Sequence, residues 1–312
     1  MRDVGWGVLG AGWLVTRATG EALRSAVGAR VVAAGARDLD RARSVGAVRS
    51  YDSYRAVIED PDVEAVYVCL ANDAHLPMIR MCIEAGKHVL CEKPLVLSAA
   101  DAESVFGQAT EAGVILVEAT WSRWHPRMRR IVELVSDGAI GDIQSFLGTF
   151  TGMGPAPDNY RTNPDMGGGA LYDVGVYPLH AMLACLPDVE EFRTLELEQL
   201  RSDRGIDLTT KAALSWGAGT RATIVASFVM PESQRLVIRG TGGEIRVEDD
   251  QAFTSWRTPS GLWIDGRIES FPATDAYRVM FEEVSASIRG EGGWVLPARD
   301  SVRVARAVDA LR

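Results

Sequence analysis

Several features that mark whole classes of protein are missing from the 312-residue sequence. No apolar run reaches the roughly 20 residues that a membrane-spanning helix needs. The N-terminus shows no basic region followed by a long apolar stretch, so no signal peptide is expected. A formal net charge of −9 argues against nucleic acid as the main partner. These absences favour a globular, cytoplasmic protein that binds small molecules.

Cysteine, histidine and lysine are also scarce. The cysteines at positions 69, 82, 91 and 185 lie among apolar neighbours, without the spacing of metal ligands. We therefore expect reduced, buried thiols and no bound metal. Lys87, Lys93 and Lys211 are the only lysines, because arginine supplies nearly all of the positive charge. A lysine that stands at a predicted cleft is therefore of interest.

The first 120 residues alternate short apolar runs with amphipathic stretches. The apolar runs predict buried parallel strands at residues 4–9, 30–36, 63–70, 88–91 and 114–118. The amphipathic stretches predict helices at residues 13–25, 39–45, 54–59, 75–85 and 99–112. Asp38, Ser53 and Ser98 stand where N-caps are expected. This βαβα alternation predicts a Rossmann domain with a doubly wound parallel sheet over residues 1–120.

The pattern changes after residue 120. Longer strand-like runs at residues 142–152, 190–201, 206–216, 221–228, 235–240 and 244–248 predict a mostly antiparallel, open sheet. Helices are expected at residues 127–136, 170–185, 275–289 and 298–312. We thus expect an α/β protein in which residues 121–312 form a second, α+β domain. The last helix is a candidate to pack back on the first domain.

The turn after the first predicted strand has the composition of a dinucleotide-binding loop. It is followed by a helix, which is the context that such a loop requires. Gly10 permits a tight turn, and Gly12 lets the backbone approach a pyrophosphate at the helix N-terminus. Val15 replaces the third glycine of the usual fingerprint, which weakens the match. Trp13 and Leu14 complete the predicted cofactor loop.

The end of the second predicted strand bears on the nucleotide. NAD enzymes usually place a carboxylate there for the ribose 2′-hydroxyl, whereas Ala36 and then Arg37 occupy these positions. Arginine can pair with a 2′-phosphate, so we predict a preference for NADP(H) over NAD(H). In the alternative interpretation Asp38 only caps a helix and Arg37 is a solvated charge, which leaves both cofactors open.

Polar residues follow the other predicted strands, where an open α/β sheet binds its ligands. Asn72 and His75 follow the third strand, and Glu92-Lys93-Pro94 follows the fourth. Trp121 and Arg123 come after the fifth. We expect Asn72, His75, Glu92 and Lys93 to contact the cofactor, and His75, Trp121 and Arg123 are candidates for substrate contact. A structural role for His75 at the start of its helix is the alternative.

Two motifs resemble signatures of one enzyme superfamily. Glu92-Lys93-Pro94 and the stretch 167–177, Gly-Gly-Gly-Ala-Leu-Tyr-Asp-Val-Gly-Val-Tyr, resemble those of the glucose–fructose oxidoreductase, inositol dehydrogenase and rhizopine catabolism superfamily. Together with the dinucleotide loop they cover nearly the whole chain. Residues 121–126 resemble the branch of dimeric dihydrodiol dehydrogenases, glucose–fructose oxidoreductase and xylose dehydrogenases. The resemblance implies hydride transfer with a sugar, polyol or vicinal-diol type substrate, and a cis Lys93–Pro94 bond.

Asp173 and Tyr177 are spaced i, i+4 and so share one face of the predicted helix 170–185. The resemblance implies that Tyr177 is the acid/base, although many members of the superfamily carry histidine there. Lys93 would favour the phenolate, and Asp173 would orient Lys93 or bind a substrate hydroxyl. His180, one turn further on, is the alternative acid and a candidate for substrate contact. Tyr160 and Arg161 resemble an aromatic–arginine pair that borders the nicotinamide.

Other functions remain open alongside a sugar or diol dehydrogenase. A ketoreductase for nucleotide-linked deoxysugars would need basic groups for a diphosphate, and Arg123, Arg127, Arg129 and Arg130 are candidates. The superfamily also contains a non-catalytic nucleotide-binding regulator and NAD-dependent glycoside hydrolases. The resemblance further implies a homodimer or homotetramer formed through the C-terminal sheet.

Overall fold

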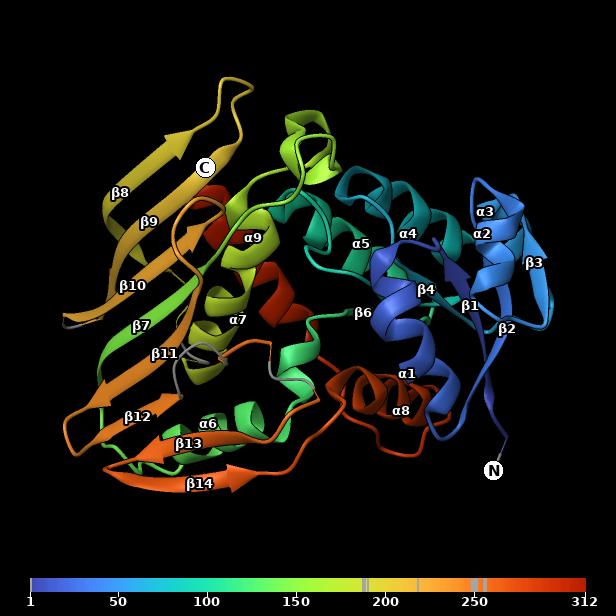
Figure 1. Ribbon diagram of the computed structural model, residues 1–312. Helices are drawn as coiled ribbons and strands as arrows, with labels where there is room; N and C mark the ends of the chain where they lie inside the picture. The colour runs from blue at the N-terminus through green and yellow to red at the C-terminus, as the bar shows by residue number, and fades with distance from the viewer. Residues whose placement is uncertain (1, 187–188, 190, 218, 248–251, 255–256) are drawn as a thin grey trace. The chain divides into compact units, whose positions relative to one another are not determined.

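The computed structural model describes residues 2–186, 189, 191–217, 219–247, 252–254 and 257–312. The chain divides into two compact units (Figure 1). Unit 1 holds the residues up to Trp121 together with Asp275–Ser301. Unit 2 holds Ser122–Thr274 and Val302–Arg312. The domain boundary at residue 120 stays a prediction. Unit 1 also includes residues 275–301, which end in the first turn of the last helix, and the rest of that helix belongs to unit 2.

Unit 1 is built on a six-stranded sheet in the order β3-β2-β1-β4-β5-β6, with every pair parallel. The strands are β1 (Val4–Leu9), β2 (Ala29–Gly35), β3 (Arg49–Tyr51), β4 (Ala65–Val68), β5 (His88–Cys91) and β6 (Leu116–Glu118). All residues of β1 and β4 are buried, as expected for strands covered on both faces. This strand order is that of a Rossmann fold, so the predicted fold class is confirmed for this part of the chain.

Three helices of unit 1 begin where the sequence places their caps. The side chains of Asp38, Ser53 and Ser98 accept backbone N–H groups at 2.9, 3.3 and 3.1 Å. The helices are α1 (Gly20–Ser25), α2 (Leu39–Ser44), α3 (Tyr54–Ile58), α4 (His75–Glu84), α5 (Ala99–Glu111) and α8 (Ala276–Ile288). A π-helical turn, η1 (Val15–Thr19), precedes α1, and a 3₁₀ turn, η2 (Asn72–Ala74), precedes α4.

Helix α8 packs on the sheet through an aromatic contact. The ring of Phe281 lies edge-on to Trp6 at 5.4 Å and to Tyr67 at 5.2 Å. The indole N–H of Trp6 donates to the Ser285 hydroxyl at 3.0 Å. These three rings are almost fully buried, and burial of a phenylalanine contributes about 1.5–3 kcal/mol. The contact ties a segment near the end of the chain to the first strand.

Unit 2 contains an eight-stranded sheet in the order β14-β13-β12-β11-β7-β10-β9-β8. Neighbours are antiparallel except β7 and β10, so the predicted mostly antiparallel sheet is confirmed. The strands are β7 (Ile143–Thr151), β8 (Arg193–Arg201), β9 (Asp207–Trp216), β10 (Thr220–Ser227), β11 (Ser233–Gly240), β12 (Glu244–Val247), β13 (Ser260–Ile264) and β14 (Arg267–Phe271). Glu190 and Glu248, which the predicted strands included, lie outside the described residues.

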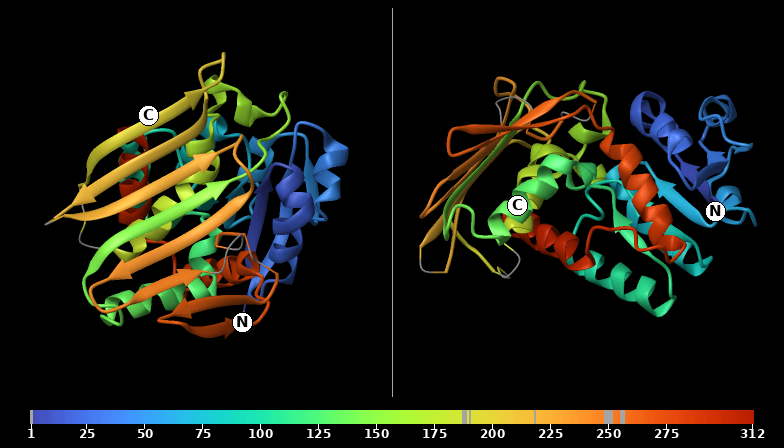
Figure 2. Two further views of the ribbon diagram at one scale, coloured as in Figure 1. Left: turned by 60° about the vertical axis from the view of Figure 1, so that its left-hand side comes forward. Right: turned by 90° about the horizontal axis from the view of Figure 1, so that it is seen from below.

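The helices of unit 2 lie on one face of this sheet (Figure 1). They are α6 (Pro126–Ser136), α7 (Val176–Cys185) and α9 (Ala298–Ala310), and η6 (Leu171–Gly175) is a π-helical turn that leads into α7. Short 3₁₀ turns are η3 (Trp121–Trp124), η4 (Tyr160–Thr162) and η5 (Pro164–Met166). Alternate residues of the central strands, such as Phe146 and Ile224, are buried toward the helices. The strands themselves are seen face-on in the left view of Figure 2.

Three strands, β3, β13 and β14, were not predicted from the sequence. The short strand β3 pairs with β2. The hairpin of β13 and β14 turns at Asp265-Gly266, where both residues have positive φ angles of 48° and 81°. The π turns interrupt two helices that were expected to be regular. Across the described residues, none of the helices combines the length and the apolar character needed to cross a membrane.

Candidate active site

The loop after β1 has the geometry of a phosphate-binding turn. Gly10 has a φ of +103°, and a side chain there would overlap the carbonyl oxygen of Cys69. A Cβ on Gly12, in contrast, would meet no heavy atom within 4 Å. The loop therefore leaves open space against its backbone where a pyrophosphate would lie at a helix N-terminus. Trp13 is 75% exposed beside this space, and Leu14 is half-buried.

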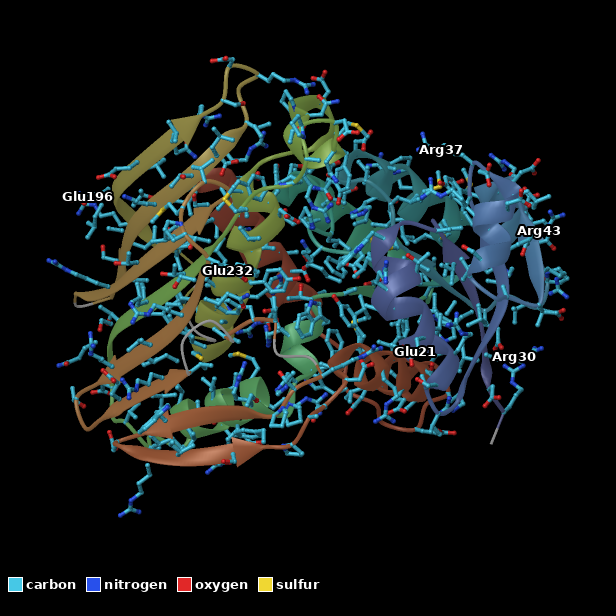
Figure 3. All side chains as sticks on the ribbon, in the orientation of Figure 1. Glu21, Arg30, Arg37, Arg43, Glu196 and Glu232 are labelled. Atoms are coloured by element: carbon cyan, nitrogen blue, oxygen red, sulfur yellow. The ribbon has the colours of Figure 1, made fainter. Side chains whose placement is uncertain are left out.

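The end of β2 presents arginine and no carboxylate. Ala36 is buried and Arg37 is exposed (Figure 3). Asp38 does cap α2, since its Oδ1 accepts the Arg41 N–H at 2.9 Å. The Arg41 side chain reaches back to the dinucleotide loop, and its Nη2 donates to the Ala11 carbonyl at 2.9 Å. Arg41 thus stands by the loop, and Arg37 lies two residues beyond Gly35, whose carbonyl accepts the Gly10 N–H at 2.9 Å. Arginines at these positions fit a 2′-phosphate better than a 2′-hydroxyl.

Arg41 is a candidate that sequence analysis missed. The sequence shows that Arg41 lies in the first turn of a helix, because it stands three positions after the cap residue Asp38. It does not show that Arg41 contacts the dinucleotide loop, because that hydrogen bond joins residues 30 positions apart.

The loop after β5 carries Lys93, and buried groups hold its backbone. The Lys93–Pro94 bond is cis. His75 is fully buried, with Nδ1 2.8 Å from the Pro94 carbonyl oxygen and Nε2 3.3 Å from that of Leu70. Burial lowers the pKa of His75, so the imidazole is neutral and donates to one of the two. The geometry favours the interpretation of His75 as a residue that positions the Lys93 loop.

Two buried carboxylates flank the same loop. Glu92 accepts the Tyr67 hydroxyl at 2.6 Å, and Glu118 accepts the backbone N–H of Leu95 at 3.0 Å. Glu92 is 5% exposed and Glu118 is 2% exposed. Asn72 is also buried, at the start of η2 after β4. Glu118 was not predicted as a site residue, because nothing in a three-residue apolar strand marks its last carboxylate as a loop anchor.

In unit 2, Asp173 lies in the π turn η6 and Tyr177 follows in α7. The Tyr177 side chain is 8% exposed, and its ring lies 5.4 Å from that of Phe150 and 6.1 Å from that of Phe253. His180 is fully buried on the same helix. The phenol therefore stands in a largely apolar setting, where a nearby charge has a larger effect than in water.

Both ends of this helix are anchored. Asp207 accepts the Leu171 N–H at 2.8 Å, and burial raises the pKa of its carboxyl. The buried Arg303 of α9 donates to the carbonyl groups of Leu183, Leu186 and Val189 at the other end. A carboxylate at the N-terminus and an arginine at the C-terminus also suit the helix dipole.

The loop before η6 brings Arg161 to Asp173. The Arg161 Nε lies 2.8 Å from Asp173 Oδ1, and the guanidinium lies 4.6 Å from the centre of the Tyr160 ring. Trp121 is buried in unit 1, stacked on Tyr277 at 4.9 Å, and Arg123 is buried in unit 2. Lys93 with the cofactor loop therefore belongs to unit 1, and Tyr177, Asp173 and Arg161 belong to unit 2.

Comparison with known proteins identifies the family. The family model described as "Oxidoreductase family, NAD-binding Rossmann fold" matches residues 4–120. The model described as "GFO/IDH/MocA C-terminal domain" matches residues 128–246. The chain belongs to the GFO/IDH/MocA oxidoreductase family. The resemblance inferred from Glu92-Lys93-Pro94 and residues 167–177 is thereby confirmed.

Members of the GFO/IDH/MocA family similar to this chain act on different substrates. D-xylose 1-dehydrogenase (NADP⁺) 2 of Haloferax volcanii is 34% identical over 88% of this chain and 86% of that protein. The trans-1,2-dihydrobenzene-1,2-diol dehydrogenase of Mus musculus is 29% identical over 86% of this chain and 79% of its own length. KijD10, a 3-ketoreductase from Actinomadura kijaniata solved with NADP and TDP-benzene, has a TM-score of 0.90 and 29% identity, and covers 100% of this chain and 97% of its own.

Among the described residues, no group of three or more His, Cys, Asp or Glu side chains is arranged so that it could hold a metal ion. Cys82, Cys91 and Cys185 are buried, and Cys69 is half-buried. Burial raises the pKa of Cys82 to about 12 and that of Cys185 to about 12, so both are inert thiols at neutral pH.

Proposed function

We infer that the protein is an NADP(H)-dependent oxidoreductase acting on a sugar, polyol or vicinal-diol type alcohol or ketone. The observation that carries this proposal is the open space at Gly12 beside two arginines, Arg37 and Arg41, with Ala36 in place of a carboxylate. A dinucleotide with a 2′-phosphate fits this set of groups. The xylose and dihydrodiol dehydrogenases among its relatives support the substrate class.

We assign the residues as follows. The backbone at Gly10–Leu14 holds the pyrophosphate, and Arg37 and Arg41 pair with the 2′-phosphate. Bound nicotinamide supplies or takes up the hydride. Tyr177 gives a proton to the carbonyl oxygen during reduction, and its phenolate removes one from the hydroxyl during oxidation. Lys93 favours the phenolate, because a nearby ammonium group stabilises negative charge.

A ketoreductase for nucleotide-linked sugars is the second candidate. The likeness to KijD10 over the whole chain, solved with NADP and TDP-benzene, favours it. Two of the four arginines named for a diphosphate are engaged within the chain, since Arg127 donates to the Ala252 carbonyl at 3.0 Å and Arg130 pairs with Glu269 at 3.2 Å.

The test is turnover of a panel that contains aldoses, inositols, vicinal diols and a nucleotide-linked 3-ketosugar, each with NADP(H) and with NAD(H). Tyr177→Phe is expected to lose about 100- to 10,000-fold in kcat, the usual contribution of a general acid or base. Tyr172→Phe is the matched control, because this tyrosine on the preceding π turn donates no proton in the proposal and instead accepts a hydrogen bond from Arg312 at 2.6 Å. Full activity of Tyr177→Phe would refute the assignment and move the acid role to His180. Turnover of the nucleotide-linked ketone alone would select the second candidate.

We also propose a homodimer or homotetramer formed through the open face of the eight-stranded sheet. The left view of Figure 2 looks onto that face, and the helices that the structure describes for unit 2 lie behind it. Leu200 points to this side, because its neighbour Gln199 points the opposite way and donates to the Leu311 carbonyl just after α9. Leu200 and Ile268 are 54% and 53% exposed. A solution mass of 33.8 kDa, that of one chain, would refute this proposal.

A further inference from the structure

An ion pair in unit 2 stands one helical turn from Tyr177. The Nε of Arg161 donates to Oδ1 of Asp173 at 2.8 Å, and the two side chains are 30% and 19% exposed. The backbone of Arg161 is fixed on both sides, because Asn159 Oδ1 accepts its N–H at 3.0 Å and Gly169 donates to its carbonyl at 3.0 Å. The guanidinium is thus held in place rather than loose on a surface.

The pair and the phenol share a poorly solvated region. Burial alone would lower the pKa of Arg161, but the negative charges of Asp173 and, more weakly, of Tyr160 and Tyr177 raise it above its ordinary value. Interaction between two titrating groups is mutual, so the same guanidinium favours the ionised form of Tyr177. The rings of Phe150 and Phe253 lie by that of Tyr177, which is 8% exposed, and charges interact more strongly in such a setting than in water.

Charged and titratable groups of unit 2 come toward Tyr177 on three elements. The π turn η6 contributes Asp173, α7 contributes His180, and η4 contributes Tyr160 and Arg161. The strand β7 and the segment 252–254 present rings, Phe150 and Phe253. Asp173 therefore acts in two opposing ways, since it disfavours the phenolate directly and at the same time neutralises Arg161.

We propose that Arg161 is a positioning residue that promotes ionisation of Tyr177, and that Asp173 is the counter-ion that limits this effect. The proposal rests on the proposed function, in which Tyr177 gives and takes the proton. In addition to the proposed role of Lys93, it makes Arg161 a cation for the phenol that belongs to the same compact unit as Tyr177. Removal of the arginine leaves the phenol with the bare carboxylate, and removal of the carboxylate charge leaves it with the uncompensated guanidinium. The two changes must move the proton affinity of Tyr177 in opposite directions.

The experiment is a spectrophotometric titration of tyrosinate in the protein without cofactor. The curve of each protein minus that of its Tyr177→Phe derivative isolates Tyr177. We expect Arg161→Gln to move the midpoint up by about one pH unit or more and Asp173→Asn to move it down, with Arg161→Lys close to wild type. The control is Arg239→Gln, which breaks an exposed ion pair with Glu244 on β11 and β12 and is expected to cause no shift.

The pH dependence of kcat is measured on the same variants and must shift with the same signs. A purely structural role predicts shifts of the same sign for Arg161→Gln and Asp173→Asn, or none, and either result overturns the proposal. If Arg161→Gln does not fold, the nearly isosteric Asp173→Asn decides, since a downward shift supports the proposal and an unchanged or raised midpoint overturns it. Full turnover by Tyr177→Phe would instead refute the proposed function, a result that is separate from the titration.

Discussion

The preference for NADP(H) over NAD(H) is expected to depend on two side chains, Arg37 and Arg41. Arg37 is exposed at the end of β2, whereas Arg41 is tethered to the dinucleotide loop by its bond to the Ala11 carbonyl. NADP(H) and NAD(H) differ only in the 2′-phosphate. Replacement of Arg37 by alanine must therefore weaken the binding of NADPH and leave that of NADH nearly unchanged. Replacement of Arg41 must weaken both, because it also frees the loop.

The magnitudes follow from the kinds of hydrogen bond involved. A bond to a charged group contributes about 1.5–3 kcal/mol, and about 1.4 kcal/mol corresponds to a factor of ten. Because Arg37 is exposed, its contribution is expected at the lower end, so Arg37→Ala raises the Kd of NADPH about tenfold. Arg41→Ala loses a similar interaction with phosphate and, in addition, the hydrogen bond from its charged guanidinium to the Ala11 carbonyl, about 1.5 kcal/mol at the lower end of the same range. It should raise the Kd of NADH about tenfold and that of NADPH by more than Arg37→Ala does.

The assay is fluorescence titration of each reduced cofactor, repeated at two salt concentrations. Added salt should narrow the NADPH difference, because it screens exposed charges. Arg43→Ala is the matched control, because Arg43 lies on α2 like Arg41 (Figure 3). Its side chain is 63% exposed and pairs with Asp40 at 2.8 Å. It should change neither Kd by more than about twofold. Equal losses of NADPH and NADH binding in Arg37→Ala would refute the reasoning.

Two further predictions concern stability. Burial raises the pKa of the Asp60 carboxyl, but the bonds from Arg49 at 2.6 and 2.7 Å and from Tyr51 outweigh it, so the pKa lies below 3.8. Asp60→Asn should lower the free energy of unfolding, measured in urea, by about 2 kcal/mol at pH 7. This difference between wild type and variant should vanish as the pH falls below the pKa of the carboxyl in the folded state. A difference that does not change with pH would contradict this. His75→Ala should cost about 2–4 kcal/mol, because the imidazole is fully buried against Pro94, and unchanged stability would argue for a role in ligand contact alone.

The parts of the fold that the sequence predicted are those that local chemistry determines. Strands β1 and β5 have the predicted bounds, since short apolar runs signal burial on both faces. The hairpin of β13 and β14 was not predicted but could have been, because Asp265-Gly266 is a strong turn signal. Strand β3 could not, since it has only three residues, all half-buried, and is defined by its pairing with β2.

The candidate site divides in the same way. Motifs identified Gly10, Gly12, Lys93 and Tyr177, because each stands at a set distance from a strand end or a glycine. The residues that contact them could not be predicted from the sequence. The bonds from Arg41 to Ala11 and from Arg161 to Asp173, and the approach of Phe253 to Tyr177, each depend on how loops return to the sheet.

The helix that carries Tyr177 shows why spacing alone is insufficient evidence for a role. The i, i+4 interval of Asp173 and Tyr177 was interpreted on a regular α-helix, yet a π turn spans Leu171–Gly175. A π turn bonds residues five apart and so rotates the side chains that follow it. Gly175 lets this turn pack closely on β10, since a Cβ there would lie 2.9 Å from Leu171 Cδ1 and 3.1 Å from Ala226 Cβ. The direction of the phenol thus depends on how the π turn and the rings of Phe150 and Phe253 pack, and a measured titration of Tyr177 is stronger evidence for its partners than any interval in the sequence.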